Sequence, residues 1–176
     1  ITADTELKRN VSADDMKTFA GPGTPAHLTA VALFRAHGLA FVDYIAPTAS
    51  AGAIATGTFT FDDSTPITVA QTVTAYVKGE VFEIAWLVGE TDIQAATKLV
   101  TAINAATDRV PVTAANGGGT LAVVTNTAKI AGPWGNDVLI RITMTGGTGG
   151  SVAASAAALA GGTTEPTFAT ALTNVQ

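Results

Sequence analysis

The side chains that most often bind metals or transfer protons are few in this sequence. It has two histidines, His27 and His37, ten residues apart. On a helix this separation corresponds to nearly three turns, or roughly 15 Å, which is too long for both imidazoles to ligate one metal ion. We therefore interpret both as surface or boundary histidines.

Two pairs of adjacent acids could bind calcium through carboxylate oxygens. Calcium loops, however, place acids at alternating positions and add a distant bidentate glutamate. The pairs Asp14-Asp15 and Asp62-Asp63 lack this spacing. We expect the first pair at a helix N-terminus, where acids interact favourably with the helix dipole, and the second pair in a solvated turn.

Glycine clusters can bind phosphate, because exposed backbone amides donate to anions. The glycines at 117–119 are not followed by Lys-Ser or Lys-Thr, and they separate two strand-like segments, so a hairpin turn explains them better. No serine has the local context of a nucleophile elbow. The sequence therefore predicts no catalytic, cofactor-binding or metal-ligating residues and no enzymatic activity.

Composition limits the classes of partner. The chain of 176 residues has a net charge of -5 and scattered basic residues, which argues against nucleic-acid binding. Only 13% of residues are charged, so neutral Thr, Ala, Ser and Gly must cover much of the surface. Such a surface is easily desolvated against other proteins, although secreted β-modules share the composition. No apolar run approaches the ~18 residues of a membrane span.

The absence of cysteine excludes disulfides, thiol nucleophiles and thiolate metal sites. The sequence begins at Ile1 without methionine and ends at Gln176, shortly after a helical pattern starts. We therefore expect a fragment of a longer polypeptide.

The central elements are expected at residues 79–144, in the order strand, helix, strand, hairpin and strand. A two-residue alternation places Phe82, Ile84 and Trp86 on one face of the first strand. Further strands are expected at residues 57–61, 72–77, 111–115, 120–125 and 137–144, with an edge strand at 151–159. A tight turn at 78–80 should join two of them as a hairpin.

The central helix is expected at about residues 92–106. Thr91 and Gln94 match a capping box at its start. Its apolar stripe consists of Ile93, Ala96, Val100 and Ile103. This stripe must be covered by a sheet, because an apolar helix face is stable in water only when buried.

Two helices and a strand are expected near the N-terminus. The first helix follows the capping residue Ser12 and ends at Gly21. The second runs over residues 25–37 and begins with a proline, which favours a first helical position. The apolar run at 39–45 is best interpreted as a buried strand. Two helices leading into one strand would form an incomplete α/β unit.

Together these elements predict an α+β fold, in which a β-rich, sandwich-like domain with one packed amphipathic helix is inserted into an incomplete α/β unit. The expected boundaries are 1–47 for the partial α/β core unit, 48–162 for the inserted β-rich domain and 163–176 for the start of a return helix to the core unit. In that last segment Phe168, Leu172 and Val175 would share one helix face.

Several short motifs resemble one protein family when taken in order. Residues 19–24 read Phe-Ala-Gly-Pro-Gly-Thr between two expected helices. This is similar to the Phe-Gly-x-Gly-Ser of the sheath proteins of contractile phage tails, particularly the Mu-like group, with Ala20 as an extra residue. Residues 76–81, the helix from Thr91, and residues 111–114 and 135–138 resemble the inserted domain of that family in order and spacing. The segment 161–166 resembles its exit into the next core helix.

The resemblance implies a structural virion protein. Sheath subunits assemble helically around an inner tail tube and contract during DNA delivery. The expected partners are therefore other copies of the chain and the tail tube protein, with no nucleic acid and no membrane. The implied location is the tail sheath of the virion, after assembly in the host cytoplasm. The resemblance implies no cofactor.

A carbohydrate-binding β-module, secreted or displayed at a cell surface, is the alternative from another class, and an enzyme is the third. A carbohydrate site would require exposed aromatic rings. The candidates are Trp86, Trp134, Tyr44 and Tyr76. Trp86 is expected on an apolar strand face and Trp134 in a glycine-rich loop, so at most one tryptophan would be displayed.

Overall fold

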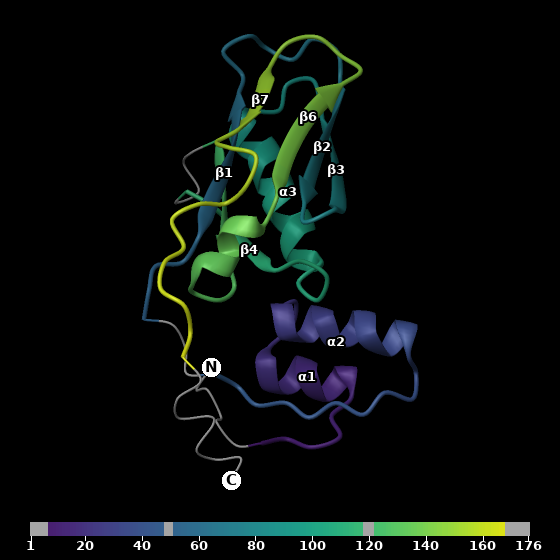
Figure 1. Cartoon of the computed structure of the whole chain (residues 1–176). Coiled ribbons are helices and arrows are strands. Elements are labelled where there is room, and N and C mark those ends of the chain that lie inside the picture. The colour runs from purple at the N-terminus through teal and green to yellow at the C-terminus, as the bar shows by residue number, and fades with distance from the viewer. Residues whose placement is uncertain (1–6, 48–50, 118–121, 168–176) are drawn as a thin grey trace.

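The computed structural model describes residues 7–47, 51–117 and 122–167. Within these ranges the chain forms three α-helices, a short 3-10 helix and seven strands in two antiparallel sheets (Figure 1). The fold is α+β with a sandwich-like β-rich part, as the sequence predicts. The helices are α1 (Ala13–Ala20), α2 (Pro25–Ala36), α3 (Asp92–Ala105) and the 3-10 helix η1 (Pro133–Asp137).

The two sheets contain four and three strands. Their orders are β4-β5-β1-β7 and β3-β2-β6. The strands are β1 (Thr56–Asp62), β2 (Gln71–Val77), β3 (Glu80–Trp86), β4 (Val112–Asn116), β5 (Val123–Ala128), β6 (Ile140–Thr145) and β7 (Ser151–Ala154).

The β2–β3 hairpin confirms the turn expected at 78–80. Val77 pairs with Glu80, so Lys78 and Gly79 form the two-residue turn. Both have positive φ, 51° and 89°. Such backbone angles match the right-handed twist of the paired strands, and glycine adopts them without steric cost.

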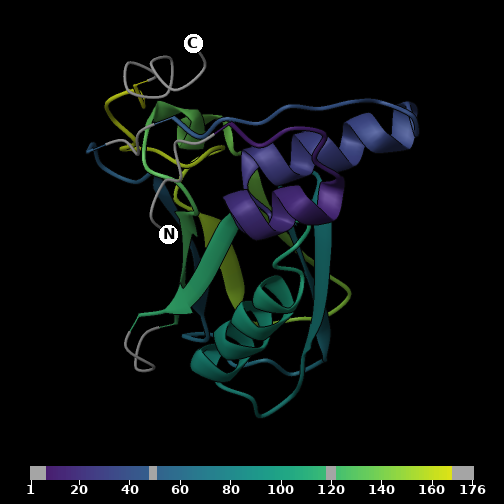
Figure 2. The same cartoon turned by 90° about the horizontal axis from the view of Figure 1, so that it is seen from below.

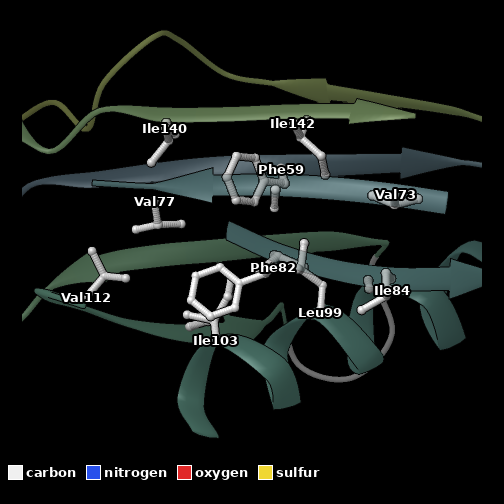
Figure 3. Close-up of a cluster of buried hydrophobic side chains, with 14 of the residues drawn as sticks. Phe59, Val73, Val77, Phe82, Ile84, Leu99, Ile103, Val112, Ile140 and Ile142 are labelled. Atoms are coloured by element: carbon white, nitrogen blue, oxygen red, sulfur yellow. The ribbon is translucent and has the colours of Figure 1, made fainter. Parts of the chain in front are cut away.

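The core lies between the sheets. Phe82, Ile84 and Trp86 alternate with exposed residues along β3 and are buried, as the sequence predicts. Figure 3 shows side chains from both sheets, including Phe59 and Val73, meeting Leu99 and Ile103 of the helix. The facing apolar surfaces therefore exclude water from a single cluster.

Helix α3 covers the side of the sandwich between β3 and β4 (Figure 2). The capping box is present: Thr91 Oγ1 accepts from the Gln94 N–H and the Gln94 side chain accepts from the Thr91 N–H. Its buried residues are Ala95, Ala96, Leu99 and Ile103. The expected stripe is thus partly wrong, because Ile93 and Val100 are only half-buried at the edge of this face.

On the opposite side, residues 155–160 cross between the sheets. Ile140 N–H donates to the Ala157 carbonyl at 2.9 Å, and Ala160 N–H donates to the Thr56 carbonyl at 2.9 Å. The expected strand at 151–159 is therefore an edge strand only as far as β7, which pairs with β1. Beyond β7 the chain makes single bridges to both sheets.

Two expected strands differ in their bounds. The 3-10 helix η1 occupies the start of the strand expected at 137–144, so β6 begins at Ile140. The β4–β5 hairpin is confirmed, but β5 starts at Val123 rather than at residue 120. Most of the expected glycine turn falls on residues 118–121, which lie outside the described residues. The expected helix face of Phe168, Leu172 and Val175 also lies outside them.

The two N-terminal helices agree with the prediction. Ser12 and Asp15 form a capping box on α1, and Thr24 caps α2, which begins with Pro25. The helices pack on each other through a small separate cluster of Val11, Met16 and Ala30. The boundaries proposed at 47/48 and 162/163 stay predictions.

The buried strand expected at 39–45 is wrong. Leu39 is 93% exposed and Phe41 is 86% exposed. Within the described residues, the backbone of this segment joins residues 8–11 along the chain before it, through a bridge between Lys8 and Tyr44 and a bond from the Val11 N–H to the Val42 carbonyl. A strand becomes buried only when other elements pack on both of its faces, and no described element packs on the side of this segment that carries Leu39 and Phe41.

Replacing Leu99 by alanine should destabilise the β-rich part. Leu99 has no exposed surface and packs between the two sheets, so truncation leaves a cavity, and we expect a loss of about 2–5 kcal/mol in the free energy of unfolding. Urea denaturation measures the change. Thr101→Ala, on the exposed side of α3, is the matched control and should change the value by less than about 0.5 kcal/mol. Equal effects of both substitutions would contradict this placement of α3.

Candidate functional site

The two histidines lie at opposite ends of α2 and in different surroundings. His27 is buried, and its Nδ1 accepts from the Gly23 N–H at 3.0 Å. The expectation of a surface or boundary residue is therefore wrong for His27, because the turn before α2 folds over it. His37 caps the C-terminal end of α2 and is exposed. The described residues contain no cluster of three or more His, Cys, Asp or Glu side chains that could hold a metal ion.

The acidic pairs take part in local structure. The Asp15 carboxylate accepts from the Ser12 N–H at 2.9 Å, and this bond lowers its pKa. Asp62 Oδ1 accepts from the Ser64 N–H, which lowers the pKa of Asp62 in the same way. Asp63 Oδ2 accepts from the N–H of Asp92 at the start of α3, at 3.2 Å.

The four aromatic candidates for a carbohydrate site do not form one exposed platform. Trp86 has no exposed surface and packs edge-on against Phe61. Trp134 and Tyr44 are half-buried. Tyr76 is also half-buried, and the Arg141 guanidinium lies over its ring at 4.3 Å.

An exposed apolar segment, residues 38–43, leads away from α2. The bond from the Val11 N–H to the Val42 carbonyl, at 2.8 Å, keeps its end extended. Leu39, Phe41 and Asp43 alternate with less exposed residues and so face the same way, toward solvent. Two large apolar side chains and one carboxylate thus project from one face.

A shallow groove runs along β6 toward the chain after β7. Its lining includes Tyr76, Leu139, Arg141, Ala154, Ala156 and Ala157. The small alanine side chains keep one wall low, while the larger side chains of β2 and β6 form the other. We call this feature the β6–β7 groove. Its volume of about 550 Å³ lies within the roughly 300–1,000 Å³ typical of ligand sites.

A polar contact joins the α1–α2 pair to the β-rich part. Lys129, directly after β5, donates from Nζ to the Pro22 carbonyl at 2.7 Å, to Thr107 Oγ1 at 3.1 Å and to the Thr107 carbonyl. Gly23 has a φ of 69°, and an added Cβ would overlap the carbonyl oxygens of Thr107 and Val110. Burial lowers the pKa of Lys129, but three oxygen acceptors favour its charged form.

An ion pair adds to this junction. Lys17 of α1 donates to Asp108 Oδ2 at 2.6 Å. The bond lowers the pKa of Asp108 and raises the pKa of Lys17. Because both side chains are substantially exposed, the pair is screened by water and orients the two parts more than it stabilises them.

No model of a known protein family matches this sequence, and a search of curated proteins also finds no match. In the part of the chain that the structure describes, each helix is too short or too polar to cross a bilayer. The histidines and acidic pairs considered for catalysis or metal binding take part in helix caps, turns and packing. The sequence did not indicate the exposed segment 38–43 or the β6–β7 groove as functional features.

Replacing Lys129 by methionine should loosen the junction. Methionine keeps an apolar stem of similar length but removes the charged donor that joins the carbonyls of Pro22 and Thr107, so water replaces this link between the two parts. We expect faster hydrogen exchange at the Gly23 amide, measured by NMR. Lys78→Met, in the exposed β2–β3 turn, is the control and should leave that rate unchanged. An unchanged rate in the Lys129 variant would contradict the assigned role.

Acid should weaken the same junction through Asp108. Because its pKa in the folded chain lies below the usual 3.8, its ionised form stabilises the folded state well above pH 3.8. That contribution is lost as the pH falls below 3.8 through the lowered pKa. Acid unfolding followed by circular dichroism should show a smaller pH-dependent loss for Asp108→Asn than for Asp137→Asn, the exposed control. Identical profiles would rule out the linkage.

Proposed function

We propose that this chain is part of a subunit of a contractile tail sheath, a structural protein of the virion that assembles helically around the tail tube and contracts during DNA delivery. The observation that carries the proposal is the exposed segment 38–43. Leu39 and Phe41 are almost fully solvated, which is unfavourable unless a partner surface covers them. An assembling subunit presents such surfaces to its neighbours.

The outer face of the four-stranded sheet supports the same proposal. Its outward residues on β1, β4 and β5 are mostly threonines, and they stand in register across the strands. They include Thr56, Thr58, Thr60, Thr113, Thr125 and Thr127. Apart from Asp62 at the end of β1, the outward residues of these three strands carry no charge that must lose its hydration when another subunit packs against them. Contacts of this kind can form and separate with a small electrostatic cost.

The junction between the α1–α2 pair and the β-rich part is compatible with contraction. The two parts have separate hydrophobic clusters and meet through polar bonds to Lys129 and Asp108. Small polar interfaces permit relative motion more readily than a shared apolar core. A change in contacts between subunits could therefore reorient one part against the other without unfolding either.

Carbohydrate binding has less support, because each of the four candidate rings is buried or half-buried rather than displayed. Tyr76 is instead covered by Arg141. Sugar rings usually stack on exposed aromatic faces, and the fully buried Trp86 offers none. The proposed sheath role, in contrast, accounts for the exposed side chains of Leu39 and Phe41 as surface that a neighbouring subunit covers.

Electron microscopy of the product of the complete reading frame tests the proposal. We expect tubes or sheath-like assemblies from the unaltered protein. Changing Leu39 and Phe41 to aspartate should reduce their number at least about tenfold, because charge prevents burial of the segment. Thr101→Asp and Ala105→Asp, on the exposed side of α3, give a matched double control for added charge at a surface without a proposed contact. Failure of the unaltered product to form any assembly would count decisively against the proposal.

A further inference from the structure

We infer that the exposed segment 38–43 of one copy docks into the β6–β7 groove of a second copy. The inference rests on the proposed function and deepens it by naming one contact between subunits. It uses two features that lack partners within the described residues: an apolar segment with a carboxylate, and an apolar groove with a guanidinium group.

The groove has the chemistry of a receptor for such a segment. Leu139 is 64% exposed and contributes apolar surface beside the low wall formed by Ala154 and Ala156. Arg141 stacks on Tyr76, and among the described residues no carboxylate pairs with it. Stacking holds the guanidinium in place while its N–H groups stay available to an acidic partner.

The segment has the complementary chemistry. Leu39 and Phe41 supply the apolar side chains, and Asp43 follows Phe41 on the same face, roughly 7 Å along an extended chain. One carboxylate oxygen of Asp43 accepts from the Asn10 N–H at 2.9 Å. This bond orients the side chain and leaves the second oxygen for a cation. In the docked pair, the apolar side chains occupy the groove and Asp43 meets Arg141.

The contact must form between copies. The groove is lined by residues of β2, β6 and the chain around β7, whereas the segment runs on the far side of α1 and α2 from these strands (Figure 1). One copy therefore cannot fill its own groove. Because the two surfaces differ, each docked copy leaves one groove and one segment open. Head-to-tail contacts of this type generate rings or helical filaments, according to the rotation between neighbours.

Mixing two complementary variants tests this contact on the full chain. The segment variant carries Leu39→Asp and Phe41→Asp, and the groove variant carries Arg141→Glu and Ala156→Trp. In sedimentation velocity up to about 1 mM, the average mass of the unaltered chain should rise with concentration, and each variant alone should stay monomeric. An equimolar mixture should form 1:1 dimers and nothing larger, because only one contact remains possible. Circular dichroism verifies that both variants fold.

A charge exchange tests the polar part of the contact. Arg141→Glu and Asp43→Arg should each weaken self-association at least about tenfold, because like charges then meet. The double variant, with both changes, should restore it. A structural defect at either position would not be repaired by the second substitution.

The inference is overturned if the unaltered chain stays monomeric up to 1 mM, or if both mixing variants self-associate as the unaltered chain does. Normal tubes from the complete product carrying the groove substitutions would overturn it too, while leaving the proposed function intact. Absence of tubes from the unaltered complete product would remove the proposed function, but dimers formed only in the mixture would still establish this contact.

Discussion

The edge-to-face packing of Phe61 against Trp86 is the contact on which the rest of the β-rich part depends. The rings lie 5.5 Å apart and come from β1 and β3, one in each sheet. Trp86 is fully buried, yet its indole N–H donates to the Glu90 carbonyl at 3.2 Å, so no lost hydrogen bond opposes its burial. The same bond fixes the loop that leads into α3. Trp86 thus contributes both to the packing between the sheets and to the shape of the loop before the helix.

The features that the sequence predicts well depend on neighbouring residues. The alternation of Phe82, Ile84 and Trp86 needs only the two-residue period of a strand. The capping box of Thr91 and Gln94 needs only four residues, and Lys78-Gly79 alone favours the hairpin turn. In each case the same local arrangement recurs in any fold that buries the strand or helix, so sequence spacing is sufficient to identify it.

The features that the sequence does not predict depend on distant parts of the chain. Residues 39–45 have the composition of a buried strand, but burial requires covering elements that local pattern cannot supply. The polar residue Asn126 is fully buried, because β5 extends three residues beyond its expected end and continues the alternation in which Val124 and Ala128 also face inward. The β6–β7 groove arises where two strands from different sheets meet, and its members span Tyr76 to Ala157. The functional proposal rests on such long-range features, which explains why residue types associated with catalysis gave no indication of it.

The crossing run at 155–160 gives the sandwich a mechanical property. Its backbone is hydrogen-bonded to Val138 and Ile140 beside one sheet and to Thr56 and Thr58 in the other. If a force slid the sheets past each other, the bonds on both sides of this run would have to break or rearrange. The β-rich part should therefore transmit a pull or a twist as a stiff body.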